Sequence, residues 1–186
     1  MPVQWAAHAI HGQSLMSTAA RRVIVAFPQF VGLDRVEAVR RRYDPLALLT
    51  AAHITLVFPF DSELTADEVA AHVRDAVRGV RPFPVHLEGV TAHEGEYLFL
   101  NVKHGNDALI ALHDRLYSGL LAPFLSREHT YVPHVTVGRL ATRAALLAAL
   151  DNAQECAGPF VTEVSTITVY RIDEEQRRPV EREVLL

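Results

Sequence analysis

Two short segments of the chain carry the same pattern of chemically active residues. His53 stands two residues before Thr55, and His134 stands two residues before Thr136, each pair inside an apolar run. In an extended strand, residues two apart point to the same face, so each histidine shares a face with its threonine and the intervening apolar residue takes the other face. If the apolar face lies in a core, both His–Thr pairs point away from it. Two imidazoles held in this way form a candidate acid–base pair.

The two motifs are informative because they occur together. A histidine has roughly a one in ten chance of being followed two positions later by Ser or Thr. Each motif alone therefore fits equally well a histidine that is hydrogen-bonded within a sheet. None of the other eight histidines has Ser or Thr at that position, and the repetition of the pattern favours a shared function.

Strands and helices alternate along the chain around the two motifs. Apolar periodicity predicts strands over 22–28, 51–58, 96–102 and 131–138, a closing hairpin of 161–171 with 180–185, and a strand introduced by Pro82 and Pro84 that runs to Thr91. Helices are predicted over 34–43 with the capping pair Asp34 and Glu37, from Thr65 with Glu68, from Asn106 and from Thr142. Each half thus reads strand, helix, histidine strand, helix, strand, a structural repeat of roughly 80 residues. Two similar α+β lobes about a pseudo-twofold axis would bring both His–Thr pairs to one groove.

The composition indicates a single folded domain. With 186 residues, 49% of them apolar, the chain can bury a core without help. Residues 1–20 lack the features of a signal peptide and are expected to form a flexible extension, which leaves 21–186 as one bilobal domain. No stretch approaches the roughly 20 apolar residues of a membrane span. The single cysteine, Cys156, is interpreted as a structural thiol in a reducing compartment. We therefore expect a cytoplasmic protein.

The charge balance limits the possible partners. A net charge of −4 lacks the basic surplus with which proteins grip a long duplex, so a short RNA end or a nucleotide, bound by a monomer, is favoured. The cluster Arg40, Arg41 and Arg42 is interpreted as a solvated helix end, with phosphate contact as the alternative. Neither a zinc-binding pattern nor a glycine-rich phosphate loop is present, so no metal or other cofactor is predicted.

The paired motifs resemble those of a known family. His53-Ile54-Thr55 and His134-Val135-Thr136, about eighty positions apart, and the segment 131–139 in particular, are similar to the signatures of the 2H phosphoesterase superfamily, which includes the bacterial 2′-5′ RNA ligase-like proteins. The resemblance implies a duplicated bilobal α+β fold, with two antiparallel sheets and flanking helices around a central cleft. It also implies metal-independent action on 2′,3′-cyclic phosphates of RNA ends or on cyclic phosphodiesters of nucleotides, with 2′-5′ RNA ligation as a further activity.

The residues themselves suit this chemistry. Opening a cyclic phosphodiester with water needs a base for the nucleophile and an acid for the departing sugar oxygen, and histidine serves both tasks near neutral pH. The hydroxyls of Thr55 and Thr136 would hydrogen-bond the non-bridging oxygens as their charge grows. The resemblance suggests His53 as the acid and His134 as the base, but the sequence itself leaves the two roles interchangeable.

Two further residues are candidates for substrate binding. Tyr131 has the aromatic face that can stack on an unpaired base, with edge packing as the alternative. Arg139 has the planar guanidinium that matches phosphate oxygens. In a strictly alternating strand, however, Arg139 shares the face of Val137 and points away from His134, unless the strand bulges at Gly138.

Other readings of the same sequence stay open. The protein could be a non-catalytic RNA-end or nucleotide-binding protein that uses the same groove, or an α+β scaffolding module whose histidines satisfy backbone groups. His72 and His113 fall on the apolar stripes of their helices and are expected at the edge of the core, and Phe58 is expected within the core.

Overall fold

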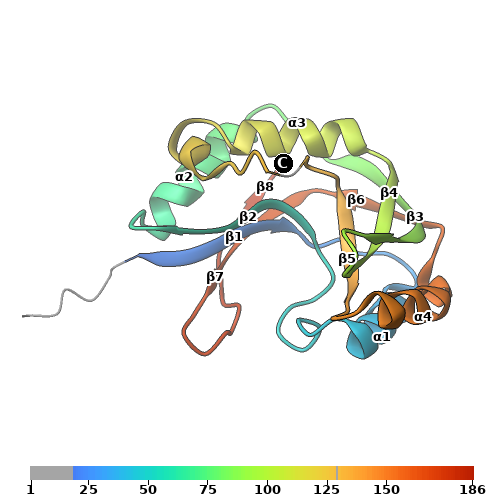
Figure 1. Ribbon diagram of the computed structural model, residues 1–186. Helices are drawn as coiled ribbons and strands as arrows, with labels where there is room; N and C mark the ends of the chain where they lie inside the picture. Colours follow the sequence, from blue (N-terminus) through green and yellow to red (C-terminus); the bar gives the residue numbers. More distant parts are fainter. Residues whose placement is uncertain (1–18, 129) are drawn as a thin grey trace, which may run out of the picture.

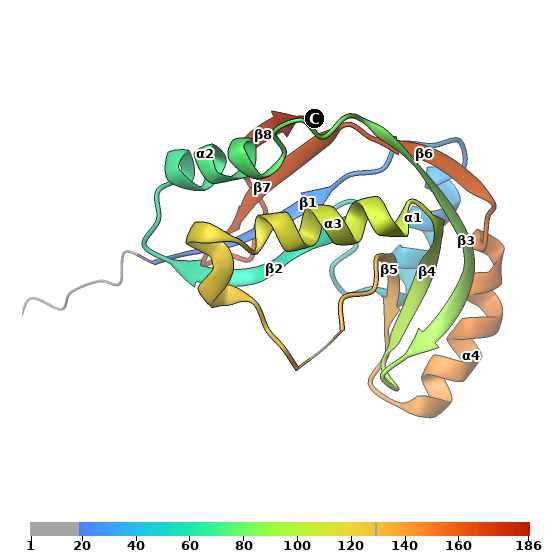
Figure 2. The ribbon, with the colours of Figure 1, turned by 90° about the horizontal axis from the view of Figure 1, so that it is seen from above.

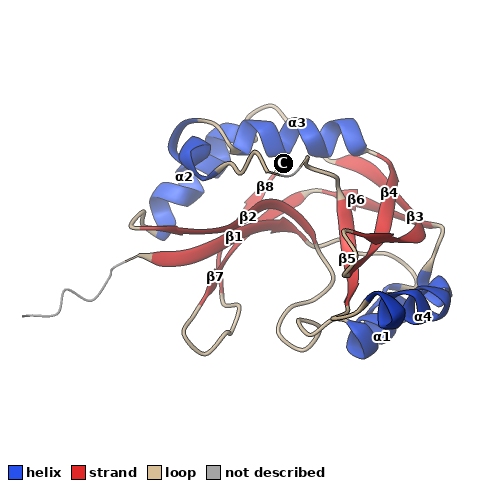
Figure 3. Cartoon of the chain, viewed as in Figure 1, coloured by secondary structure: helices blue, strands red, loops and turns tan. Residues whose placement is uncertain are grey.

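The computed structural model describes residues 19–128 and 130–186, which form an α+β fold (Figures 1 and 3). The strands are β1 (Ala20–Ala26), β2 (Ile54–Ser62), β3 (Phe83–His93), β4 (Tyr97–His104), β5 (His134–Arg139), β6 (Phe160–Val164), β7 (Thr166–Ile172) and β8 (Val180–Leu185). The helices are α1 (Leu33–Tyr43), α2 (Ala66–Ala76), α3 (Asn106–Leu116) and α4 (Arg143–Ala153), with short 3-10 helices η1 (Gly119–Phe124) and η2 (Gln154–Cys156).

The strands form one antiparallel sheet in the order β6-β3-β4-β5-β2-β1-β7-β8. This differs from the expected pair of separate sheets, because β2 and β5 join in the middle through the residue pair Ile54 and Val135. The sheet also mixes the two halves of the sequence. The turn between β3 and β4, where Glu94 and Gly95 both have positive φ, folds β3 back onto β4 and so places it beside the strands of the second half.

The sheet curls strongly. Only Ser165 separates β6 from β7, yet β3, β4, β5, β2 and β1 all lie between them in the sheet. The segment after β1 returns to the β6 edge, where the Gln29 amide donates to Thr162 Oγ1 over 3.1 Å and the Thr162 hydroxyl donates to the Gln29 carbonyl over 2.9 Å. The predicted strand over 161–171 is therefore wrong: it is two strands, and only β7 forms the closing hairpin with β8.

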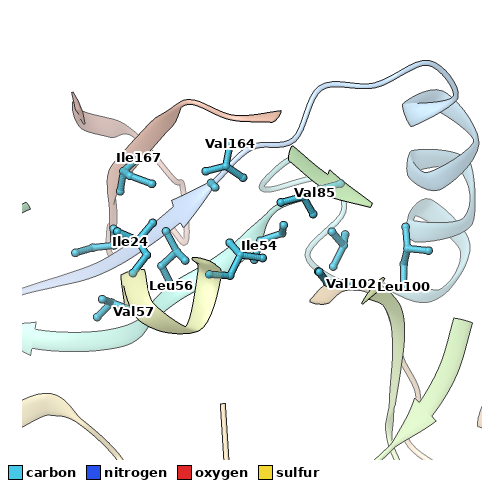
Figure 4. Packing of buried hydrophobic residues seen from close by; sticks show 14 of the residues in the cluster. Ile24, Ile54, Leu56, Val57, Val85, Leu100, Val102, Val164 and Ile167 are labelled. Carbon is cyan, nitrogen blue, oxygen red and sulfur yellow. The ribbon is translucent and has the colours of Figure 1, made fainter. Parts of the chain in front are cut away.

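Helices cover the side of the sheet that carries the core. Helix α3 packs on β2 and α1 packs on β5, so each histidine strand has a helix behind it, and α4 lies along β3 and β4 (Figure 2). The largest cluster of buried residues, part of which is shown in Figure 4, is continuous across the two halves of the sheet and includes Ile24, Ile54, Leu56 and Leu100. Burial of this apolar surface is the main favourable term in folding.

Two of the four predicted helix caps are confirmed. Thr65 caps α2 in a full capping box with Glu68, and the Thr142 side chain accepts from the Ala145 amide at the start of α4. The other two are wrong, because α1 and α3 begin after left-handed glycines, Gly32 (φ 96°) and Gly105 (φ 92°). Glycine adopts this backbone conformation without steric cost, so these helices start without a side-chain cap.

The expected extension over 1–20 falls mostly outside the described residues, which begin at Ala19, and Ala20 already belongs to β1. The described helices are all too short or too polar to span a lipid bilayer.

Candidate functional site

The two His–Thr motifs meet at the centre of the sheet. Ile54 of β2 pairs with Val135 of β5, and both side chains are buried in the core, with 0% and 1% exposed. Thr55 and Thr136, the next residue on each strand, are only partly buried, so they point to the other face. The sequence prediction that each motif turns its apolar residues inward and its polar residues away is confirmed.

Antiparallel pairing arranges the four polar residues as a square. If the register at Ile54 is extended by one residue in each direction, His53 comes to lie beside Thr136, and Thr55 beside His134. The two histidines occupy one diagonal, for which about 7–8 Å between the backbones is typical. The two imidazoles also act on one another electrostatically, since a charge on His53 lowers the pKa of His134. The structure therefore brings together the four residues predicted to be catalytic.

Each histidine ring is fixed by the same kind of hydrogen bond, from its Nδ1 to the backbone carbonyl two residues earlier. Nδ1 of His53 donates to the Ala51 carbonyl over 2.8 Å, and Nδ1 of His134 donates to the Val132 carbonyl over 2.6 Å. A carbonyl oxygen can only accept, so Nδ1 carries the hydrogen in both rings. Nε2 is then the nitrogen that takes up or releases a proton.

The surroundings of the histidines favour the neutral ring. Burial lowers the pKa of His53 below its usual value near 6.5. Burial also lowers the pKa of His134 to about 4, and the positive charges of His93 and His53 act in the same direction. An anion bound between the rings would reverse both effects, because it stabilises the imidazolium form.

Both strands bulge directly after the threonine. On β2 the residues Leu56 and Val57 are both buried, and on β5 Val137 and Gly138 are both buried. The pairing with the neighbouring strand shifts register at these points in each case. Gly138 packs tightly there, because a Cβ atom would lie 3.0 Å from the Tyr43 Cβ on α1, so a larger residue would force a neighbour to shift. Each bulge turns the following residue back to the histidine face.

The residues that follow the bulges differ in kind. On β5 the residue is Arg139. Strict alternation along the strand would turn it away from His134, but the bulge breaks this alternation and returns Arg139 to the histidine face. Its Nε donates to Glu96 over 3.0 Å, and its guanidinium lies 5.3 Å from the centre of the Tyr97 ring. On β2 the residue is Phe58, which is 44% exposed, and the expectation that it lies in the core is wrong.

Tyr131 links the two motifs. Its hydroxyl donates to the Thr55 carbonyl over 2.8 Å, and its ring stacks on His113 at 4.0 Å with an interplanar angle of 9°. The Tyr117 hydroxyl similarly accepts from the Phe58 amide over 2.9 Å. Tyrosine hydroxyls thus bond the edge of β2 beyond the pair at Ile54. The hydroxyl and one ring face of Tyr131 are engaged within the protein, which leaves less of it for the base stacking predicted from the sequence.

A buried ionic network, which the sequence analysis missed, holds the chain before His53. Arg40 is 1% exposed and pairs with Asp44 over 2.7 Å and with Glu37 over 3.0 Å. It also donates to the Thr50 carbonyl over 3.0 Å, and Glu37 accepts from the Ala52 amide over 2.6 Å. The interpretation of Arg40 as a solvated residue is wrong. The spacing of Glu37 and Arg40 on one helix face, with Asp44 directly after the helix, was the available signal.

An aromatic stack, also missed, holds His134. The ring of Phe99 on β4 lies 3.4 Å from the His134 ring, centre to centre, with an interplanar angle of 17°. His93 on β3 stacks on Phe99 at 4.8 Å. By contrast, the ring contacts of His53 with described residues are edge contacts, with Phe27 at 5.9 Å and Tyr170 at 6.3 Å.

The remaining histidine and cysteine predictions agree with the structure. His72 lies at the edge of the core with Nε2 2.8 Å from the Leu116 carbonyl, and His113 is buried beside Tyr117. Cys156 is fully buried, and burial raises the pKa of its thiol to about 11, as expected of a structural residue.

Comparison with known proteins gives the same picture. A family described as the 2′-5′ RNA ligase superfamily matches residues 28–176. A Geobacillus kaustophilus protein named "Putative phosphoesterase" is 34% identical over 119 residues, which are 62% of this chain and 67% of the relative. A similarly named Bacillus pumilus protein is 31% identical over 119 residues, which are 62% of this chain and 68% of that relative.

Solved structures share the fold. Escherichia coli LigT crystallised with 3′-AMP superposes with a TM-score of 0.62 at 18% identity, over 90% of this chain and 98% of LigT. Its apo form gives a TM-score of 0.60 at 17% identity, over the same shares of the two chains. The family match covers most of the chain and includes both His–Thr motifs. The protein belongs to the 2′-5′ RNA ligase superfamily, the group of 2H phosphoesterases that its two motifs resemble.

Proposed function

We propose that the protein is a metal-independent phosphodiesterase that opens 2′,3′-cyclic phosphates at RNA ends or in nucleotides. The observation that carries the proposal is the square of His53, Thr136, Thr55 and His134 around the buried pair of β2 and β5, with the Nδ1 atom of each ring tied to its own backbone. A single phosphate facing this square would meet two proton-transfer groups and two hydroxyl donors.

The reaction divides the work between the histidines. One Nε2 removes a proton from water, whose oxygen attacks phosphorus, and one P–O bond of the ring breaks. The other imidazolium gives its proton to the ribose oxygen that departs. The resemblance of the two motifs to those of the family suggests His53 as the acid and His134 as the base, and burial of both rings makes the neutral, proton-accepting form available to either.

The threonines and Arg139 act on the phosphate oxygens. Hydroxyl donors strengthen their hydrogen bonds as negative charge grows in the pentavalent transition state. Arg139 lies on the histidine face and would exchange its exposed contact with Glu96 for a substrate phosphate. Side-chain rearrangements of this kind are common on binding.

The net charge of −4 supports a short RNA end or a nucleotide as the substrate, since a long duplex requires a basic surface. The proposal also holds that the protein acts in the cytoplasm, as a monomer, on RNA fragments. The matched motifs and matched bulges also support the origin of the two half-sites from one duplicated unit.

The test is hydrolysis of 2′,3′-cyclic nucleotides and of a short RNA with a cyclic phosphate end by protein purified in EDTA. We expect conversion to a phosphomonoester at a rate that chelator does not change. Complete loss of activity in EDTA that zinc or manganese restores would instead indicate a metallohydrolase. Tight binding without turnover would favour an RNA-end binding protein. A ligation assay with 2′- and 5′-terminated fragments tests the further activity.

A further inference from the structure

The aromatic stack behind His134 involves a third imidazole that the proposed reaction does not use. Phe99 lies on β4, whose neighbours in the sheet are β3 on one side and β5 on the other. His134 comes from β5 and stacks on Phe99 at 3.4 Å, and His93 comes from β3 and stacks at 4.8 Å with an interplanar angle of 26°. Since the strands flank β4, the two imidazoles lie on opposite faces of one phenyl ring.

The outer and inner members of the stack differ in exposure. Phe99 is 8% exposed and stands opposite Thr136 in the β4–β5 register. His93 ends β3, is 43% exposed, and has its Nε2 3.5 Å from the Glu94 carboxylate. The His93 ring is therefore open to solvent while it stays in contact with the ring that packs on His134.

We propose that Phe99 and His93 are positioning residues for His134. Phe99 fixes the plane of the imidazole, and the positive charge of a protonated His93 adds to burial in favouring the neutral form of His134 that a general base requires. This inference rests on the proposed function for its catalytic meaning, but the effect of His93 on the proton affinity of His134 exists without any substrate.

The short contact distance explains how Phe99 fixes the plane of the His134 ring. A ring centre 3.4 Å away leaves no space for water, so the imidazole cannot swing away from the position in which Nδ1 bonds the Val132 carbonyl. With Nδ1 held in that bond, Nε2 is the ring nitrogen that remains for proton transfer. Loss of the phenyl ring would free the imidazole to rotate about its side-chain bonds.

Electrostatic repulsion explains how a charge on His93 affects the protonation of His134. A cation on one face of a phenyl ring is stabilised by the ring's quadrupole. Two cations on opposite faces share this stabilisation and repel each other across a thin apolar layer. Protonation of His93 therefore disfavours protonation of His134.

The other groups around His134 leave His93 as its main charged neighbour within the described residues, together with His53. From β4 come Phe99 and, directly opposite His134 in register, the uncharged Asn101. From β2 comes Thr55, which is also uncharged. On β5 itself, Arg139 is paired with Glu96.

The first experiment measures the proton affinity of His134 without substrate. Histidine ring signals are followed by NMR from pH 3 to 9, and the signal that disappears in His134→Gln is assigned to His134. In His93→Gln we expect the midpoint of His134 to rise by about half a pH unit, and in His93→Arg we expect it to stay low, because the charge is kept. His86→Gln, which removes an exposed histidine from the same strand, is the matched control and should leave the midpoint unchanged. An unchanged midpoint in His93→Gln would overturn the role of His93.

The second experiment uses turnover and addresses Phe99. We expect Phe99→Leu to lower kcat about tenfold while KM changes less than twofold, and Phe99→Tyr to keep most of the activity because the ring remains. Circular dichroism and urea denaturation identify any variant that has lost its fold, and the His93 variants, which alter an exposed side chain, still test the inference if Phe99→Leu unfolds. Unchanged kcat in a folded Phe99→Leu would overturn the positioning role of Phe99. If the wild-type protein has no turnover, the proposed function fails while the NMR titration still decides the influence of His93.

Discussion

The two half-sites of this protein share a backbone and differ in almost every supporting side chain. In the first half-site, which comprises His53, Thr55 and Phe58, the chain before the histidine is held by the buried ionic network of α1. In the second, which comprises His134, Thr136 and Arg139, the histidine itself is held by an aromatic stack. In both, Nδ1 bonds the carbonyl two residues earlier and a bulge follows the threonine.

The features that the two half-sites share are those that the proposed chemistry needs in duplicate. Ring orientation, tautomer and the hydroxyl two residues on are matched in the two half-sites, whereas support from behind is achieved by unrelated interactions. The residues after the bulges also diverge, with an apolar Phe58 on one side and a cationic Arg139 on the other. A substrate between them would therefore meet a chemically asymmetric site built on a symmetric frame.

Removal of either imidazole is the strongest test of the shared chemistry. We expect His53→Gln and His134→Gln each to lower kcat about a thousandfold, within the range typical of acid–base groups. The double variant should be little worse than either single one, because the two rings act as a unit. His104→Gln, an exposed histidine of β4, serves as the control. A loss of less than tenfold in either single variant would contradict the paired mechanism.

The buried ionic network of α1 should stabilise the fold far more than an exposed ion pair on the same helix. Arg40→Met leaves two carboxylates without their partner, and we expect it to lower the free energy of unfolding by about 3 kcal/mol in urea denaturation. Arg42→Met removes an exposed ion pair with Glu155 from the same helix, and should cost less than about 1 kcal/mol. Equal effects of the two substitutions would show that burial of Arg40 does not distinguish them.

The threonines should contribute equally if the frame is symmetric. We expect Thr55→Val and Thr136→Val each to lower kcat about thirtyfold with little change in KM, because the lost hydrogen bonds strengthen only in the transition state. Steady-state kinetics of both variants on one cyclic nucleotide measures this. A change confined to KM would mean that the hydroxyls bind the substrate without promoting its reaction.

The pH profile should reveal the protonation states that the reaction requires of the two rings. The base must be neutral, and the pKa of His134 at about 4 places the acidic limb of kcat/KM near that pH. The acid must be protonated, and the pKa of His53 below 6.5 makes the basic limb begin under that value. We expect a bell with its maximum in mild acid and a roughly tenfold loss per pH unit above it. A profile that is flat from pH 5 to 9 would contradict the assignment.

The smallest effect is expected where the half-sites diverge. Arg139→Met should raise KM about fivefold through loss of a charge-assisted contact to phosphate, and it should reduce the salt dependence of KM. Phe58→Leu should leave that salt dependence unchanged, since Phe58 carries no charge. If both variants show the same salt response, the asymmetry between the two positions has no electrostatic consequence.

The sequence predicted the centre of the site better than its surroundings. The alternation of His53, Ile54 and Thr55 with its second copy was sufficient to assign faces, because a strand has only two. The paths of β3 and β6 through the sheet were not predictable in this way, since strand pairing depends on turns and on contacts between distant segments. The stack of His93, Phe99 and His134 was hidden for the same reason: it exists only in the register of three strands.

The two bulges correspond to a recognisable pattern in the sequence, whereas the glycine helix starts do not. Thr55 is followed by the apolar doublet Leu56-Val57, and Thr136 by Val137-Gly138, so strict alternation fails at the same point in both copies. The missed caps have a simpler cause: Gly32 and Gly105 start helices through backbone conformation, which residue preferences for side-chain caps do not detect.

Because one residue pair, Ile54 and Val135, joins the two halves of the sheet, the spacing of the two imidazoles depends on the volume of these two buried side chains. Ile54 and Val135 face the core directly behind the site, where the two halves of the sheet join. A smaller or larger side chain at either position would change the packing behind the site and tilt one half of the sheet relative to the other. This would change the distance between the two imidazoles that flank the substrate phosphorus. Substitutions that never contact a substrate can therefore adjust which substrates fit.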